Sequence, residues 1–203
     1  MKIAIIGATG HVGSRILAEA VHRGHDVTAL ARDPSRFQGH AHVTPLSVDV
    51  TSPDALTLSL HGHDAIVSAL RFDGTDAQSL IHAVRASGVK RLLVVGGAGS
   101  LEVAPGSVLV EQPGFPAEYK SESLAGKHFL DTLRGEDTLE WTFISPSALF
   151  VPGERTGHFR LGKDTLLHDA DGKSWVSFED FAIAMLDEIE HPAHVRQRFT
   201  VGY

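Results

Sequence analysis

The sequence predicts an α/β fold with a doubly wound, mostly parallel sheet of about seven strands and helices on both faces. Four short runs are almost entirely apolar, which is typical of strands that helices cover on both sides. These runs are residues 3–6, 65–67, 92–95 and 142–144. Between them, apolar residues recur at helical spacing over residues 12–21 and 77–84. Strands that alternate with helices in this way are expected to pair in parallel.

Glycines mark the ends of the first two helices, and three more strands complete the sheet. Gly24 and Gly88 can adopt the left-handed conformation that closes a helix, and a strand candidate follows each of them. A last helix is expected over residues 178–189, with Ser177 as its N-cap. The further strands are expected at residues 27–31, 43–47 and 198–201.

Length and composition indicate one globular domain spanning residues 1–203. Hydrophobic residues make up 42% of the chain and charged residues 21%, which is ordinary for a folded domain and excludes wholesale disorder. The 18 Lys and Arg against 25 Asp and Glu give a net charge of −7, and no basic run occurs. Because nothing attracts nucleic acid or an anionic membrane electrostatically, neither is an expected partner.

Metal sites, disulfides and export are not expected. The chain has no cysteine, so disulfides and thiolate ligands are excluded. Its 13 histidines present no set of three ligands at a metal-binding spacing. The apolar run after Met1 is too short for a secretory signal, and no stretch approaches the roughly 20 apolar residues of a membrane span. A cytoplasmic location is therefore expected.

A glycine-rich stretch lies between the first strand and the first helix. Its spacing is Gly-x-x-Gly-x-x-Gly, which permits a tight turn and brings backbone N–H groups at a helix N-terminus close to a bound anion. With these flanking elements, the motif predicts a site for the diphosphate of a dinucleotide. The residues assigned to this site are Gly7, Thr9, Gly10, His11, Val12 and Gly13.

The residues after the second strand favour NADP(H) over NAD(H). A protein that prefers NAD usually presents an acidic residue to the ribose hydroxyls at this point. Here Arg32 comes first, and Arg36 follows shortly after it. Guanidinium groups suit a 2′-phosphate because they form paired, charge-assisted hydrogen bonds. The alternative is that both arginines are solvated and that Asp33 binds the ribose.

Several segments carry a family resemblance. Residues 2–37, KIAIIGATGHVGSRILAEAVHRGHDVTALARDPSRF, resemble the atypical short-chain dehydrogenase/reductase proteins, above all the NADH-flavin reductase group. They are also similar to biliverdin reductase B and the NmrA-like proteins. Later segments resemble the same flavin reductase group: VVGGAGS, EYK, WTFISPSALFVPGERTG and RFT. The resemblance implies a Rossmann fold in which Asp49 and Val50 approach the adenine. It also implies that Ala69 and Leu70 border the cofactor, and that Gly96 and Gly97 lie beside the nicotinamide.

The usual proton relay of short-chain dehydrogenases is absent from this chain. That relay pairs a Tyr with a Lys four residues later, on one helix face, so that the ammonium favours the tyrosinate. Four residues after Tyr119 stands Ser123, and the chain contains no Asn at all. Tyr119 and Lys120 remain the candidate catalytic residues, in contact with ribose or substrate. The alternative is that they form an exposed helix start.

Two long connections follow predicted strands and are expected to wall the substrate site. They span residues 97–118 and 147–174, and both should lie at the carboxyl edge of the sheet. The residues expected to line the pocket are Ser100, Phe115, Ser145, Pro146, Phe150 and Arg155.

The expected function is that of an NAD(P)H-dependent oxidoreductase. Ketone reduction develops an alkoxide that needs a placed acid, whereas a flavin or another conjugated acceptor spreads the incoming charge. The missing relay therefore favours direct hydride transfer to a planar small molecule, with FMN or FAD as a candidate substrate. The alternative is a non-catalytic, NAD(P)-sensing regulator of NmrA-like type. The sequence leaves the oligomeric state open.

Overall fold

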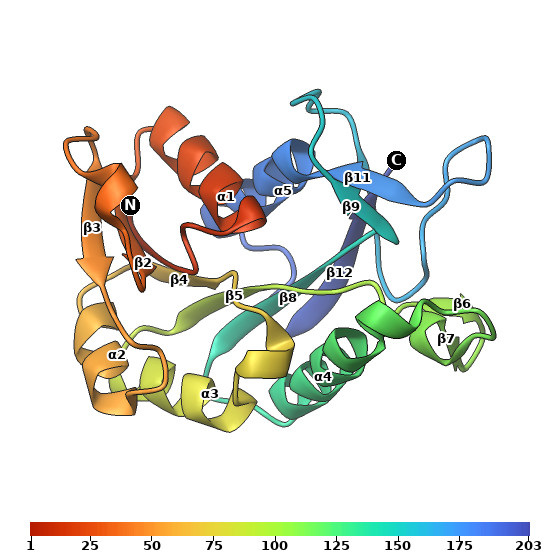
Figure 1. Ribbon diagram of the computed structural model, residues 1–203, viewed down its shortest axis with the longest axis horizontal. Helices are drawn as coiled ribbons and strands as arrows, with labels where there is room; N and C mark the ends of the chain where they lie inside the picture. The colour runs from red at the N-terminus through yellow and green to blue at the C-terminus, as the bar shows by residue number, and fades with distance from the viewer.

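The computed structural model describes residues 1–203 and shows an eight-stranded sheet between two layers of helices (Figure 1). The strand order is β10-β12-β8-β5-β4-β1-β2-β3. These strands are β1 (Lys2–Ile6), β2 (Asp26–Ala31), β3 (Val43–Ser47), β4 (Ala65–Ser68), β5 (Arg91–Val95), β8 (Glu140–Pro146), β10 (Arg160–Gly162) and β12 (Gln197–Gly202). All neighbours pair in parallel except β10, which runs antiparallel to β12. The predicted doubly wound, mostly parallel sheet is confirmed.

Helices cover both faces of the sheet (Figure 1). On one face lie α1 (His11–His22) and α5 (Phe178–Glu190), and on the other lie α2 (Pro53–Leu60), α3 (Ala77–Ala86) and α4 (Ala117–Arg134). Alternate residues of β1 enter different cores, because successive side chains of a strand point to opposite faces. Ile3 and Ile5 join the core under α1 and α5, while Ala4 and Ile6 join the core under α2, α3 and α4. This double burial explains the continuous apolar runs. None of the helices is both long enough and apolar enough to cross a membrane.

The seven strands expected from the sequence all lie in the sheet, and the elements that it did not reveal are short or polar. The eighth strand, β10, has three residues and lies within the stretch expected to be a loop. The two long connections also contain β6 (Glu102–Ala104), β7 (Ser107–Val108), a 3₁₀ turn (Leu109–Glu111) and β9 (Leu149–Val151), which pairs with β11 (Trp175–Ser177). Elements of two or three residues are too short to show a hydrophobic period.

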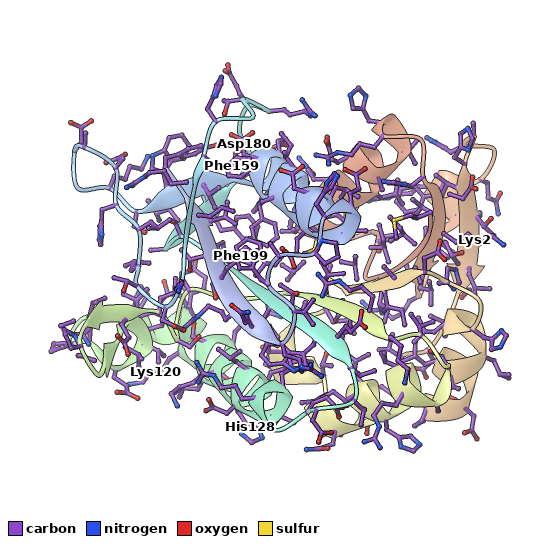
Figure 2. The ribbon with its side chains drawn as sticks, turned by 180° about the vertical axis from the view of Figure 1, so that it is seen from behind. Lys2, Lys120, His128, Phe159, Asp180 and Phe199 are labelled. Atoms are coloured by element: carbon purple, nitrogen blue, oxygen red, sulfur yellow. The ribbon has the colours of Figure 1, made fainter.

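Two predicted helix signals occur as expected. Gly24 and Gly88 both have φ of +80° directly after their helices. Residues with a Cβ rarely adopt this backbone conformation. At the start of α5, Ser177 Oγ accepts a hydrogen bond from the N–H of Asp180 at 3.0 Å. The Asp180 side chain is fully buried and accepts hydrogen bonds from the N–H groups of Thr156 and Gly157 at 2.7 and 2.8 Å (Figure 2). The connection before β10 is thereby fixed to α5.

β1 lies at the point where the order of the strands reverses. It pairs with β2 on one side and with β4 on the other, and the chain proceeds outward from there in both directions. In open α/β sheets, ligands bind outside the carboxyl ends of the strands at such a reversal. The glycine-rich stretch directly follows β1 at this edge.

Charged side chains join α1 to α5 and to the connection after β9. Glu19 on α1 is 5% exposed and accepts hydrogen bonds from Arg155 at 2.8 and 2.9 Å and from Arg23 at 2.8 Å. Arg23 also pairs with Asp187 and Glu190 of α5. The hydrogen bonds from Arg155 have the largest effect on the pKa of Glu19. Burial opposes them, and Arg23 helps to bring that pKa to about 2.

Replacing Glu19 with Gln should flatten the acid limb of the stability curve. The folded pKa of about 2 lies below the ordinary 4.5, so Glu19 stabilises the fold fully above pH 4.5 and progressively less as the pH falls towards 2. We expect Glu19→Gln to cost up to about 2 kcal/mol at neutral pH, because solvent screens the half-exposed Arg155, and almost nothing near pH 2. Urea unfolding across this range measures the difference, and a cost independent of pH would contradict the assignment.

Candidate functional site

The turn after β1 is built from backbone in close contact. Gly7 has φ of +81°, and its N–H donates to the carbonyl of Leu30 at the end of β2 at 2.9 Å. A Cβ on Gly7 would lie 2.7 Å from the carbonyl oxygen of Ala69, directly after β4. A Cβ on Gly13 would lie 2.3 Å from the carbonyl oxygen of Gly7. Neither position accommodates a side chain without displacing the backbone, so both glycines are required by this turn.

The first turn of α1 presents unpaired N–H groups at the same place. Gly10 is the N-cap, no side chain caps the helix, and no acidic residue lies in its first turn. The N–H groups of His11, Val12 and Gly13 donate to no acceptor within the chain. These N–H groups and the positive end of the helix dipole fit an anion. The residues present therefore fit the diphosphate of a dinucleotide, with half-buried Thr9 at the turn.

The two arginines after β2 are accessible to a ligand. Arg32 and Arg36 are exposed, and neither forms an ion pair within the chain. The guanidinium of Arg36 lies 4.8 Å from the ring centroid of Phe37. The carboxylate of Asp33 accepts a hydrogen bond from the N–H of Ser35 at 3.0 Å, which closes a local turn. Asp33 is thus engaged by the protein, whereas both guanidinium groups are free.

The residues after β3 and β4 border the same edge of the sheet. Asp49 accepts hydrogen bonds from the hydroxyl of Thr51 at 2.7 Å and from its N–H at 2.9 Å, and both lower the pKa of the exposed carboxyl group. Val50 and Leu70 pack against the core under α2 and α3, and Ala69 packs against the core under α1. All four predicted positions therefore lie at the carboxyl edge of the sheet, two of them after β3 and two after β4.

A cleft of about 650 Å³ opens at the carboxyl ends of β5 and β8. Its volume lies in the range of small-molecule sites. The 97–118 connection, the first turns of α4 and residues 146–151 form its walls. The predicted site residues that line it are Gly96, Gly97, Ser100, Phe115, Tyr119, Pro146 and Phe150. The structure thus brings one face of each long connection together around a single cavity.

Three predicted residues lie elsewhere. Lys120 is exposed near the start of α4 (Figure 2). It lies outside the cleft, because successive helical residues are rotated by about 100° and Tyr119 faces the cavity instead. Ser145 is fully buried, and its Oγ lies 3.5 Å from the guanidinium of Arg198. Arg155 is held on α1 by its ion pair with Glu19 rather than at the cleft. The side chains of Ser145 and Arg155 therefore serve packing and ion pairing in this structure.

Aromatic side chains connect the glycine turn to the cleft. His11, in the first turn of α1, stacks on Phe178 with ring centroids 6.3 Å apart. Phe178 in turn contacts Phe150 edge-on, with centroids 4.7 Å apart, and Phe150 lines the cleft. A dinucleotide whose diphosphate lies at the turn can therefore extend towards the cleft along this row of rings.

Helix α4 approaches the cleft floor closely because two glycines allow it. A Cβ on Gly99 would lie 2.7 Å from Cβ of Ser123, and a Cβ on Gly126 would lie 2.8 Å from the ring of Phe72. Tyr119 and Ser123 both line the cleft, as positions four apart on one helix face should. Ser123 therefore occupies the place where the usual relay has its lysine.

Glu122 also lines the cleft, and nothing in the sequence singled it out. Its carboxylate accepts hydrogen bonds from the N–H groups of Phe72 and Asp73 at 2.8 and 2.9 Å, which fixes the segment after β4 to α4. Gln112 and Ser147 are further lining residues outside the prediction. The spacing from Tyr119 pointed to Ser123 in the sequence, whereas Glu122 is recognisable only by its distant partners.

The two cleft walls are joined to each other by a buried arginine. Arg198 on β12 donates to the carboxylate of Asp164 at 2.6 and 2.8 Å and to Ser100 Oγ at 3.2 Å. Burial lowers the pKa of its guanidinium, and the ion pair with Asp164 opposes that shift. The N–H of Glu102 donates to the carbonyl of Asp164 at 2.8 Å, and the N–H of Leu166 donates to the carbonyl of Glu102 at 2.9 Å.

A doubly wound sheet with a glycine turn at its reversal point defines a Rossmann-fold, nucleotide-binding protein. The chain belongs to the NAD(P)H-binding family, whose model matches residues 7–192. It contains no group of three or more His, Asp or Glu side chains placed to hold a metal ion.

Known proteins resemble the chain over its whole length. The uncharacterized protein YwnB of Bacillus subtilis (strain 168) is 42% identical over 213 residues, covering 99% of this chain and 98% of that protein. The structure of a proposed epimerase from Bacteroides thetaiotaomicron is 42% identical with a TM-score of 0.95, covering 100% of this chain and 96% of its own. The structure of a proposed NADH-flavin reductase from Streptococcus pneumoniae TIGR4 is 33% identical with a TM-score of 0.87, covering 100% of this chain and 99% of its own.

Replacing Gly13 with Ala should abolish coenzyme binding. The added methyl group would meet the carbonyl oxygen of Gly7 at 2.3 Å and must displace the turn that presents the free N–H groups. We expect affinity for NADPH to fall by at least about 100-fold, because the diphosphate contacts supply much of the binding free energy. Isothermal titration calorimetry measures the affinity of both proteins for NADPH. Gly135→Ala is the control, since its Cβ would meet only Thr132 O at an ordinary 3.5 Å. Unchanged affinity in Gly13→Ala would contradict the diphosphate site.

Proposed function

We propose that residues 1–203 form one NAD(P)-binding domain of an NAD(P)H-dependent reductase whose acceptor is a flavin or another planar, conjugated molecule. The two connections, 97–118 and 147–174, provide the walls of the acceptor site. Membership of the NAD(P)H-binding family and the likeness to the proposed flavin reductase support this assignment. A cytoplasmic location stays a prediction.

The observation that carries the proposal is the composition of the cleft. Ser123 stands where a lysine would activate Tyr119. Lys127 is the one lysine that lines the cavity, and no histidine lines it. Reduction of a ketone or an epimerisation needs a placed acid or base, whereas a conjugated acceptor delocalises the incoming charge. The site therefore suits the second chemistry better. Tyr119, 62% exposed at the rim, is proposed to contact ribose or acceptor, while Lys120 lies outside the lining.

The protein is proposed to position the coenzyme against the acceptor and to exclude water from the cleft. NAD(P)H held at the glycine turn would supply a hydride, which carries two electrons and one proton. The second proton would come from solvent, so that the products would be the dihydro acceptor and NAD(P)⁺. The backbone at Gly96 and Gly97 forms the floor, where a Cβ on Gly96 would overlap the ring of Phe143. Phe115 and Phe150 provide apolar walls for a flat ring.

Arg32 and Arg36 support a preference for NADP(H). Both guanidinium groups are free while Asp33 is bound to its own turn. Charge-assisted hydrogen bonds to a 2′-phosphate fit these donors.

A second candidate function is that of a nucleotide-sensing regulator without turnover. The same absence of a Tyr and Lys pair favours it, because a sensor needs only the coenzyme site. Binding of the coenzyme without reduction of any acceptor distinguishes the sensor from the reductase.

Oxidation of NADPH in the presence of riboflavin, FMN or menadione is the direct test. We expect a steady loss of absorbance at the nicotinamide band that depends on protein and acceptor, with turnover of about 1 per second or more. Gly13→Ala protein is the control for free coenzyme chemistry. Tight NADPH binding with no turnover on any of the three acceptors would refute the reductase and support the sensor.

Replacing Arg32 and Arg36 together with Ala should remove the discrimination between coenzymes. Because two charge-assisted contacts are lost, we expect the affinity for NADPH to fall by about 10- to 100-fold and the affinity for NADH to stay nearly unchanged. Dissociation constants for both coenzymes measure this. Arg134→Ala, an exposed arginine near the end of α4, is the matched control. Equal weakening of NADH and NADPH would show that Asp33 or another group selects the ribose.

A further inference from the structure

The cleft offers no free cation to an anionic acceptor. Of its 23 lining residues, only Glu122 and Lys127 carry a charge. The carboxylate of Glu122 is occupied by two backbone N–H groups, and Nζ of Lys127 lies 3.3 Å from the carboxylate of Asp131. A phosphate entering this cavity would lose its hydration without gaining an unpaired cation as its partner, which costs free energy.

The wall around the cleft adds negative charge. Residues 97–118 contain three glutamates and no Lys, Arg or His. Glu111 and Glu118 directly precede residues that line the cleft, namely Gln112 and Tyr119. Both glutamates are exposed, and neither forms an ion pair or hydrogen bond with its side chain. Lys120 offsets one of these charges, so the rim stays acidic on balance.

Two arginines close to the cleft are occupied by acidic partners. Arg71, beside the lining residue Phe72, is held by Asp73 with hydrogen bonds of 3.1 and 2.7 Å. Arg198, beneath the floor, is held by Asp164. The two arginines without a hydrogen-bond or ion-pair partner, Arg32 and Arg36, lie after β2, where the coenzyme ribose is proposed to bind.

We propose that this cleft selects an uncharged planar acceptor, a flavin ring without a phosphate or a quinone, and that Glu111 and Glu118 discriminate against phosphorylated flavins. This inference rests on the proposed reductase function and narrows its substrate class. The redox step is the one given above, with the hydride passing to the acceptor and one proton coming from solvent.

Riboflavin and FMN make the sharpest comparison, because they share the ring and differ by one phosphate. We expect kcat/KM for riboflavin to exceed that for FMN by about three- to tenfold at low ionic strength, and the ratio to shrink with added salt, since exposed charges are screened. Quenching of flavin fluorescence by the protein with bound NADP⁺ should give the same ratio of affinities without any turnover.

The double substitution Glu111→Gln and Glu118→Gln should bring the values of kcat/KM for riboflavin and FMN to within about twofold of each other. The change should come mainly from a higher kcat/KM for FMN. Glu140→Gln is the matched control, because Glu140 is exposed at the opposite, amino edge of the sheet and its loss should leave the ratio unchanged.

Two results would overturn the inference. One is a wild-type protein that binds or reduces FMN as well as riboflavin. The other is a selective loss of FMN binding in Lys120→Met, which would show that Lys120 grips the phosphate. Absence of turnover together with preferential binding of riboflavin would instead refute the reductase and leave the charge selection standing.

Discussion

Close packing of backbone against backbone at the turn after β1 is the constraint on which the site depends. Gly7 lies against Ala69, and Gly13 lies against Gly7, with no room for a Cβ at either contact. This contact fixes α1 so that its free N–H groups lie at the carboxyl edge of the sheet, where the paired strands β1 and β4 end. The other parts of the site lie at the same edge of the sheet: the arginines follow β2, and the cleft lies beyond β5 and β8.

The fold was predictable because its sheet is buried on both faces. Strands such as Ile3 to Ile6 have apolar side chains on both sides and therefore stand out from their surroundings. Helix α4 did not stand out, since most of its surface is polar and it contacts the core through Gly126, Phe129, Leu130 and Leu133. β10 and the hairpin β6–β7 are too short for any periodic signal.

The site was predictable where the backbone alone determines it and less so where side chains choose distant partners. The glycine turn and the floor at Gly96 and Gly97 follow from local chain geometry. Arg155 illustrates the other case, because nothing near it in the sequence reveals that its partner is a carboxylate on α1. Arg198 and Glu122 act through residues far away in the chain, so their roles become visible only in the folded structure.

The bridge between the two connections bears on how such a scaffold could be re-engineered. Because Arg198 and the strand-like contact of Glu102 with residues 164–166 tie both walls to β12 and to each other, neither wall is an independent module. Transplanting one loop from a homologue would leave a buried guanidinium without its counter-ion, which proteins tolerate poorly. A successful graft has to carry both segments and the arginine as a set, so new specificities in this scaffold are expected to arise through concerted exchange.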